Sequence, residues 1–181
     1  MKEQALGLAA AAWRKLPRPL RVAFLGAANH RVAIGTIGLI HDGAGRVLLL
    51  EHRFRPSHPW GLPGGYLKKG EAPEEGLRRE LFEETGLQIR VETGIIDTEY
   101  NIGGGYVAVA LVAQAEPRPL LLSSEILSGR FFDTGELLSA PSGPVIGGLN
   151  PPAGAIAALN AYPWHLELIR KWRIAERSRA E

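Results

Sequence analysis

Between Gly65 and Leu87 the chain concentrates acidic residues on one short predicted helix, in the segment GYLKKGEAPEEGLRRELFEETGL. Pro73 suits the first turn of a helix, where its missing N–H costs nothing. Gly86, followed by an apolar residue, suits the left-handed position that ends a helix. The pattern therefore predicts a helix from about Pro73 to Thr85.

The acids of this helix crowd onto one face. Leu77 and Leu81 form the buried stripe, whereas Glu80, Glu83 and Glu84 lie three and four residues apart beside it. Like charges at this spacing repel by about 0.2–0.5 kcal/mol per pair, and the last turn is the negative end of the helix dipole. A hard cation would remove this conflict. Magnesium fits best, because it binds carboxylates, waters and substrate phosphates.

An acidic helix face can also be ordinary protein surface, paired with nearby lysines and arginines. The wider pattern argues against that interpretation. It reads Gly65, five residues, Glu71, seven residues, and then the run RELFEETGL from Arg79 to Leu87, and the LPGG of residues 62–65 leads into it. This segment resembles the complete signature box of the Nudix hydrolases. The resemblance covers about residues 31–136 and weakens toward the C-terminus.

The resemblance implies an α/β fold, a Nudix-type α/β/α sandwich with a mixed central sheet. We expect residues 1–30 to form an N-terminal helical extension and residues 31–181 to form the Nudix hydrolase domain, including a C-terminal helix. Within the extension, residues 6–16 read as a short helix ended by prolines. Packing on its own domain, a contact in a homodimer and contact with a membrane surface are all open for it, the last being the least expected.

The periodicity of the remaining chain predicts its other elements. Residues 33–40 and 46–51 read as a hairpin around HDGAG, and residues 88–100 and 106–115 as two further extended segments. Residues 131–133 read as a short apolar element. A final helix is expected from about Pro163 to Arg177, and its tryptophans and leucines are expected to pack rather than to bind a ligand.

Composition sets limits on function. The chain has 181 residues, 45% of them hydrophobic, which suits one domain with a full core. It has no cysteine, which excludes disulfides, thiolate metal sites and a cysteine nucleophile. Its net charge is only +2 without a basic stripe, so no nucleic-acid partner is expected. Without a long uncharged apolar stretch, a cytoplasmic location is expected.

For the reaction, the resemblance implies hydrolysis of a nucleoside diphosphate linked to another moiety, by attack of water on one phosphorus of the pyrophosphate. It also implies Mg²⁺ as the cofactor, with Mn²⁺ as a possible substitute. Carried over by position, Glu80, Glu83 and Glu84 correspond to the metal ligands, with the Gly64 carbonyl as a further ligand. Arg79 corresponds to the residue that orients Glu80.

Two acids are candidates for the general base, because the base varies within the family. They are Glu80 and Glu125, the latter in SSEILSGRFFD, which resembles the segment where many relatives place an extra acid. Gly65, Glu71 and Gly86 complete the structural part of the motif.

Further side chains are candidates for binding the substrate. Arg53 and Arg55 leave the second predicted strand just before the box, and a guanidinium suits bidentate contact with phosphate oxygens. Trp60, Tyr100 and Tyr106 could stack on a base, although aromatic residues at such positions more often serve packing.

No signal for one substrate stands out, so the expected substrate is a nucleotide, a nucleotide sugar or an ADP-ribose-like compound. Two alternatives remain: a Nudix-like module that senses a nucleotide without hydrolysing it, and a regulatory domain recruited to a partner or membrane by its basic ends. Isopentenyl diphosphate isomerase shares the fold, but it uses a cysteine that this chain lacks.

Overall fold

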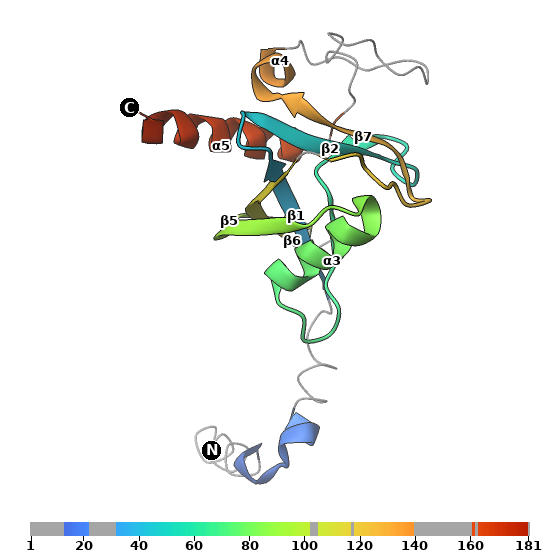
Figure 1. The fold of residues 1–181 in the computed structure, drawn as a ribbon. Coiled ribbons are helices and arrows are strands. Elements are labelled where there is room, and N and C mark those ends of the chain that lie inside the picture. The colour runs from blue at the N-terminus through green and yellow to red at the C-terminus, as the bar shows by residue number, and fades with distance from the viewer. Residues whose placement is uncertain are drawn as a thin grey trace.

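The computed structural model describes residues 13–21, 32–101, 105–116, 118–139, 161 and 163–180. Within these residues, seven strands form one sheet, and helices lie on both of its faces (Figure 1). The elements are β1 (Ala33–His41), β2 (Arg46–His52), β3 (Trp60–Gly61), β4 (Gly64–Tyr66), α3 (Pro73–Thr85), β5 (Ile89–Asn101), β6 (Tyr106–Ala115), β7 (Ile126–Asp133), α4 (Thr134–Ser139) and α5 (Pro163–Ala180).

The sheet is mixed, as predicted. Its main path runs β3-β2-β1-β6-β5, with β4 paired to β1 and β7 paired to β2. The pair β1–β6 is parallel and the other pairs are antiparallel. Strand β1 changes partner along one edge: residues Gly35 to Ile37 pair with β4, whereas His41 pairs with β2. The sheet therefore divides between β2 and β4, and this division leaves space for a site.

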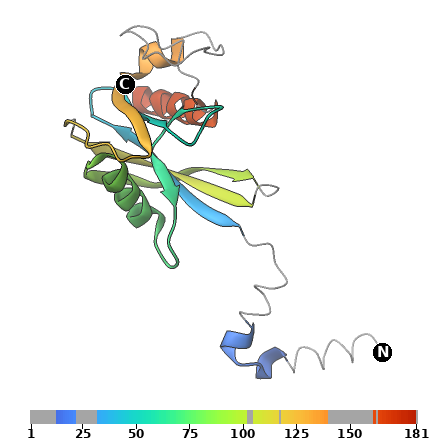
Figure 2. The ribbon, with the colours of Figure 1, turned by 90° about the vertical axis from the view of Figure 1, so that its right-hand side faces the viewer.

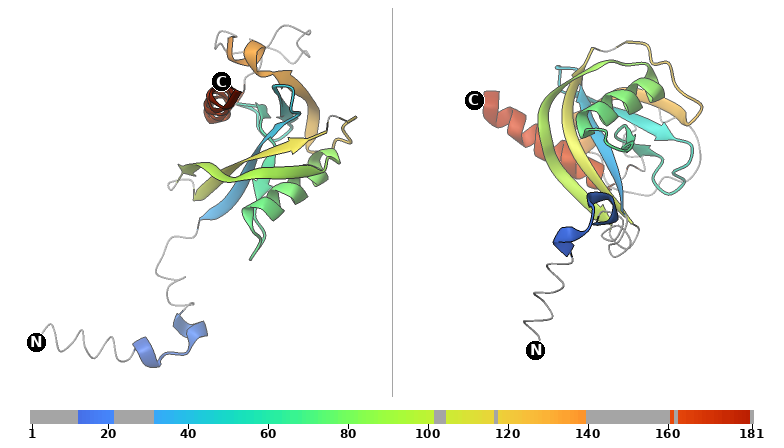
Figure 3. Two further views of the ribbon diagram at one scale, coloured as in Figure 1. Left: turned by 60° about the vertical axis from the view of Figure 1, so that its left-hand side comes forward. Right: turned by 90° about the horizontal axis from the view of Figure 1, so that it is seen from below.

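Two apolar clusters form the core, one on each face of the sheet. Strand β1 alternates between them, because successive side chains of a strand point to opposite faces. Leu39 belongs to the cluster under α5 with Leu168, and Ile40 belongs to the cluster under α3 with Leu77. Figures 2 and 3 show α3 and α5 on opposite sides of the strands. The predicted α/β/α sandwich is thus confirmed.

Helix α3 has the predicted bounds. Pro73 lies in its first turn, and the helix ends at Gly86, whose φ of 72° is left-handed and whose N–H donates to the carbonyl of Phe82. The last turn contains no basic residue. The carboxylates of Glu83 and Glu84 therefore lie at the negative end of the helix dipole, and Glu83 is paired with Arg79 one turn earlier at 3.5 Å.

Other predictions need correction or lie outside the description. Strand β7 begins at Ile126, five residues before the predicted apolar element, because it pairs with β2 along that strand's whole length. The short strands β3 and β4 were not predicted.

Of the expected N-terminal extension, only residues 13–21 are described. They include helical residues that lie away from the sheet in Figures 1 and 3. No helix within the described residues is long and apolar enough to cross a membrane.

Helix α5 is tied to the loop before β4 by a buried histidine. The Nδ1 atom of His165 accepts the N–H of Leu62 at 3.0 Å, and both residues are buried. Burial, and then the positive charge of Arg55, lower the pKa of His165 to about 3, so that the ring is neutral near pH 7. With Nδ1 as the acceptor, the ring proton resides on Nε2.

This contact predicts an effect on stability. We expect His165→Leu to lower the free energy of unfolding by about 1–3 kcal/mol, because the buried N–H of Leu62 loses its acceptor. His165→Asn keeps an acceptor oxygen near the position of Nδ1 and is expected to cost less. Urea unfolding of both variants tests this, and equal midpoints would contradict it. Because the folded pKa lies below the ordinary value of 6.5, the histidine's contribution is present above pH 6.5 and is lost as the pH falls toward 3.

Candidate functional site

The acids predicted from the sequence line one cavity, of about 460 Å³, at the place where the sheet divides. Helix α3 supplies three of them, and the loop before β7 supplies the fourth. The cavity also holds one of the two predicted arginines. Its lining residues are His52, Phe54, Arg55, Gly64, Gly65, Tyr66, Glu80, Glu83, Glu84, Ser123, Ser124 and Glu125.

The two glycines of β4 allow the helix to lie against the backbone. Gly64 has a φ of +148°, and a Cβ there would lie 2.1 Å from the carbonyl oxygen of Thr36. A Cβ on Gly65 would lie 2.4 Å from the carboxyl carbon of Glu80. The first glycine is thus required by the sheet. The second makes room for one of the predicted functional acids.

Arg79 holds the box together. Its Nε donates to Glu71 Oε1 at 2.7 Å, its Nη2 donates to Glu71 Oε2 at 2.9 Å, and its Nη1 donates to Glu80 Oε1 at 2.7 Å. Hydrogen bonding to Arg79 lowers the pKa of Glu71 to about 2. Glu71 also accepts the N–H of Lys68 at 2.7 Å, which fixes the loop before the helix. Arg79 thus joins Glu71 to Glu80, and the supporting role of Glu71 and the orienting role of Arg79 stay predictions.

Glu84 is the most perturbed acid of the cavity. Burial raises its pKa to about 8, although a hydrogen bond from the Gly64 backbone and the charge of Arg55 lower it. Its Oε2 is buried and has no hydrogen-bond partner among the described residues. The nearby His52 Nδ1 lies 3.9 Å from Oε1, and burial lowers the pKa of His52 to about 3, so that ring supplies no charge. A buried carboxylate oxygen without a partner is costly, and a bound cation would supply one.

The residues present fit a hard divalent cation by their chemistry. The donors are carboxylate oxygens, which suit Mg²⁺ and Mn²⁺, and Glu80 and Glu125 add negative charge near Glu84. Within the described chain, however, no three acidic or histidine side chains converge closely enough to hold one ion in the present arrangement. The carboxylates line the cavity together but do not close on one point.

The two predicted arginines have different surroundings. Arg55 lines the acidic cavity. Arg53 donates from Nε to the carbonyl of Ser124 at 2.9 Å, and its N–H donates to the carbonyl of Glu125 at 2.8 Å. Arg53 thus ties the loop that carries Glu125 to the end of β2. Its predicted contact with substrate stays a prediction.

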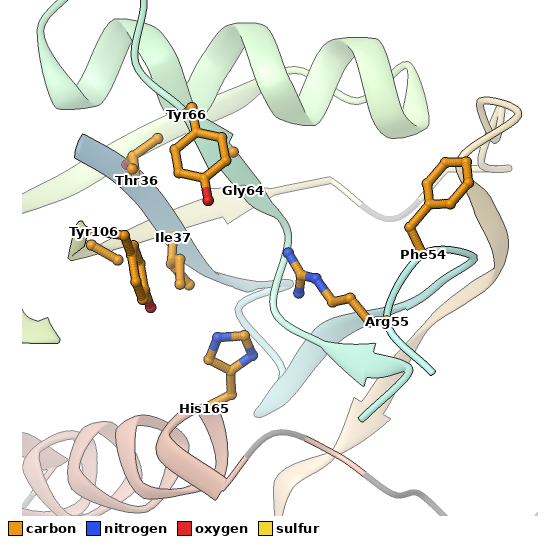
Figure 4. A pocket seen from close by; sticks show the side chains of 11 residues that line it. Thr36, Ile37, Phe54, Arg55, Gly64, Tyr66, Tyr106 and His165 are labelled. Atoms are coloured by element: carbon orange, nitrogen blue, oxygen red, sulfur yellow. The ribbon is translucent and has the colours of Figure 1, made fainter. Parts of the chain in front are cut away.

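Figure 4 shows a second cavity, of about 410 Å³. It adjoins the acidic cavity, with which it shares lining residues. The two share Phe54, Arg55, Gly64, Gly65 and Tyr66. The rest of its lining comes from β1, β6 and α5, namely Gly35, Thr36, Ile37, Tyr106, Ala108 and His165. We call this space the aromatic hollow.

Sequence reasoning missed part of both cavities. His52, Phe54, Tyr66 and His165 carry no local signal, because the fold brings them together from segments far apart in the chain. Of the three aromatic residues considered for stacking, Trp60 is buried edge-on against Phe132. Tyr100 is exposed, and only Tyr106 lines the hollow.

Fold and site together define an α/β/α domain in which a helix with an arginine-braced carboxylate cluster faces a cavity beside an aromatic hollow. Residues 29–147, more than half of the chain, match the model of the NUDIX domain family. The chain belongs to this family, as its signature box predicted.

Curated relatives match over part of their length. A MutT-like protein of Streptomyces ambofaciens is 38% identical over 90 residues, which cover 49% of this chain and 53% of the relative. An RNA pyrophosphohydrolase of Azorhizobium caulinodans is 37% identical over 76 residues, covering 38% and 45%. The chain thus spans about half the length of these two relatives.

Solved structures share the fold at low sequence identity. The NUDIX domain of Shewanella oneidensis NrtR, complexed with ADP ribose, has a TM-score of 0.62 at 19% identity and covers 88% of this chain and 99% of that one. A C. elegans Ap4A hydrolase in a binary complex has a TM-score of 0.60 at 20% identity, covering 81% and 99%. At this identity the likeness establishes the fold alone.

Proposed function

We propose that the chain is a Mg²⁺-dependent pyrophosphohydrolase, with Mn²⁺ as a possible substitute. Its substrate is a nucleoside diphosphate linked to another moiety, such as a nucleotide, a nucleotide sugar or an ADP-ribose-like compound. One observation carries this proposal: the carboxylate cavity and the aromatic hollow adjoin and share five lining residues, among them Arg55. A molecule with an aromatic end and a diphosphate fits such a pair of compartments.

The chain's own residues have distinct roles in this proposal. Glu80, Glu83, Glu84 and the Gly64 carbonyl would hold the metal, which would neutralise phosphate charge and lower the pKa of a bound water. Arg79 keeps one oxygen of Glu80 in place through the 2.7 Å hydrogen bond.

Two carboxylates remain candidates for accepting the proton of the attacking water. Glu80 lies on α3, and Glu125 lies on the loop tied by Arg53, so the cavity has an acid from each element. Replacing each in turn by glutamine distinguishes them. The variant of the base should lose the acidic limb of the pH–rate profile, whereas loss of a metal ligand should shift the metal dependence.

A nucleotide sensor is the alternative to hydrolysis. It would need the hollow but not the carboxylates, and here every position of the box is filled. The relative named as an RNA pyrophosphohydrolase leaves the absence of a nucleic-acid substrate a prediction. A cytoplasmic location and a homodimer also stay predictions.

The deciding experiment is a substrate panel. It comprises ADP-ribose, sugar nucleotides, dinucleoside polyphosphates, NADH, coenzyme A, nucleoside triphosphates and a 5′-triphosphorylated RNA, each with Mg²⁺, with Mn²⁺ and with chelator. Metal-dependent release of phosphate or mononucleotide from one class supports hydrolysis and identifies the substrate. Silence across the panel, with nucleotide still bound, would favour the sensor.

Arg55 is expected to matter more than Arg53. Arg55→Lys keeps a positive charge but loses the guanidinium fork that matches phosphate oxygens. We expect its kcat/KM to fall by about tenfold, on the order of one charge-assisted hydrogen bond. Arg53→Lys serves as the matched control, with a change of less than about threefold because its contacts are to the loop backbone. The reverse order of effects would contradict the assignment.

A further inference from the structure

The floor of the aromatic hollow is one row of residues across four strands. The pairing registers align Tyr66 of β4 with Gly35 of β1, Gly35 with Ala108 of β6, and Ala108 with Glu99 of β5. Side chains of such a row point to the same face of the sheet. The two central residues, Gly35 and Ala108, are small, whereas Tyr66 and Glu99 at the ends of the row are large. The row therefore leaves a space above its middle.

Two tyrosines line this hollow. Tyr66 lines it at one end of the row, and its side chain is 62% exposed. Tyr106 lies in the adjacent row, paired with Ala33, and Figure 4 shows its ring across the space from that of Tyr66. Aromatic rings on an otherwise small-residue floor suit a flat ring, and base–aromatic stacking is tolerant of base identity. The rings alone therefore do not select one base.

The hydrogen bond of the Tyr106 hydroxyl decides whether its oxygen donates or accepts toward the hollow. It donates a hydrogen bond to Oε2 of Glu99. A phenolic oxygen has one proton, so with that proton directed to Glu99 the oxygen serves as an acceptor toward the hollow. Tyr106 thus offers an acceptor to a ligand in the hollow.

We propose that the aromatic hollow binds the base of the substrate and selects adenine and cytosine, which carry an amino group where hypoxanthine and uracil carry a carbonyl. Tyr106 is the specificity-determining residue, since its oxygen accepts from the amino group. Glu99 is a positioning residue, since it fixes the direction of the Tyr106 hydroxyl. The carbonyl of hypoxanthine or uracil has no proton to donate to that oxygen. The inference rests on the proposed function for the nucleotide nature of the ligand.

The test is equilibrium binding of ADP, IDP, CDP and UDP to the full chain, measured by calorimetry in the presence of chelator so that metal-dependent turnover cannot consume the ligands. We expect the wild type to bind ADP about tenfold more tightly than IDP, and CDP about tenfold more tightly than UDP, on the order of one hydrogen bond. Tyr106→Phe keeps the ring and should bring both ratios close to one.

Three further variants separate the roles. Glu99→Gln should lower the two ratios. The amide of glutamine can donate to the tyrosine oxygen as well as accept from it, so the Tyr106 proton is no longer held toward residue 99. Tyr66→Leu should weaken all four ligands by about tenfold while keeping the ratios, because it removes stacking alone. Tyr100→Phe is the matched control: Tyr100 follows Glu99 in β5, is 69% exposed, and should leave every value unchanged.

The possible results test the base selection separately from the proposed hydrolysis. Equal binding of all four ligands by the wild type, no binding of any of them, or unchanged ratios in folded Tyr106→Phe and Glu99→Gln would each overturn the proposal. If the ratios behave as expected but no compound of the substrate panel is hydrolysed, the base selection stands and the proposed hydrolysis fails. If hydrolysis occurs without base preference, only the base selection fails.

Discussion

Glu84→Gln is expected to lower turnover by about 10²–10⁴-fold while the protein stays folded. Removing one charged ligand takes away part of the metal's stabilisation of transition-state charge, which amounts to several kcal/mol, and each 1.36 kcal/mol is a factor of ten in rate. Glutamine has nearly the same shape as glutamate, so the packing around α3 is retained. Steady-state kinetics with the hydrolysed compound of the panel, over a range of Mg²⁺ concentrations, measures the loss.

The same substitution has an opposite effect on stability in the metal-free protein. Because burial raises the folded pKa of Glu84 from 4.5 to about 8, the carboxyl's contribution is fully present below pH 4.5 and is lost as the pH rises toward 8. Glutamine has no proton to lose, so we expect Glu84→Gln to have a higher Tm than the wild type at pH 8 in chelator and a similar Tm at pH 4.5. Mg²⁺ should raise the wild-type Tm and have less effect on the variant.

Glu83→Gln and Glu74→Gln complete the comparison. Glu83 lies on the cavity and is also predicted as a ligand, so its variant should lose most turnover with folding intact. Glu74 lies in the first turn of the same helix, at the opposite end from the cavity acids, and its variant is the matched control. Full activity in both purified cavity variants would refute the metal assignment. Loss of activity in Glu74→Gln would mean that the helix as a whole, rather than the cavity, is at fault.

How far the sequence could predict the molecule depends on the range of the interactions concerned. Helix α3 was predicted at both ends, because Pro73 and Gly86 act within one turn of the chain. Strand β6 was also predicted in full, since its apolar run has clear ends. The shared helix face of Glu80, Glu83 and Glu84 followed from the helical period, and the signature box identified the family. Each of these signals lies within one segment.

Properties that depend on pairing between segments were not predictable in the same way. Strand β7 carries a weak pattern of its own and is ordered by pairing with β2. The hollow depends on a row that joins four strands, so neither Gly35 nor Ala108 shows its role in the sequence. His165 is more than a hundred residues from Leu62, the residue whose N–H it accepts. The difference between Arg53 and Arg55 likewise appears only with the loop that carries Glu125 in place.

Two neighbouring glycines of β4 are expected to fail in different ways when replaced by alanine. Gly64→Ala places a Cβ 2.1 Å from the carbonyl oxygen of Thr36, which is backbone of the paired strand β1, and it does so at a φ of +148° that L residues rarely adopt. Neither strand can move without breaking the β1–β4 pairing. We expect a loss of at least about 3 kcal/mol in the free energy of unfolding, seen as a lower urea midpoint or as insoluble protein.

Gly65→Ala meets a side chain instead of backbone. Its Cβ would lie 2.4 Å from the carboxyl carbon of Glu80, the end of a flexible side chain, so the backbone can stay in place while the carboxylate turns away from Arg79. We expect a change of less than about 1 kcal/mol in stability but a loss of about 10²-fold in kcat, because displacements near 1 Å in a reacting site have costs of this order. Unfolding curves and kinetics on both variants test the contrast. A Gly65→Ala protein with normal kcat would show that the position of Glu80 does not matter for turnover. A stable Gly64→Ala protein would show that the β1–β4 pairing accommodates a Cβ at this position.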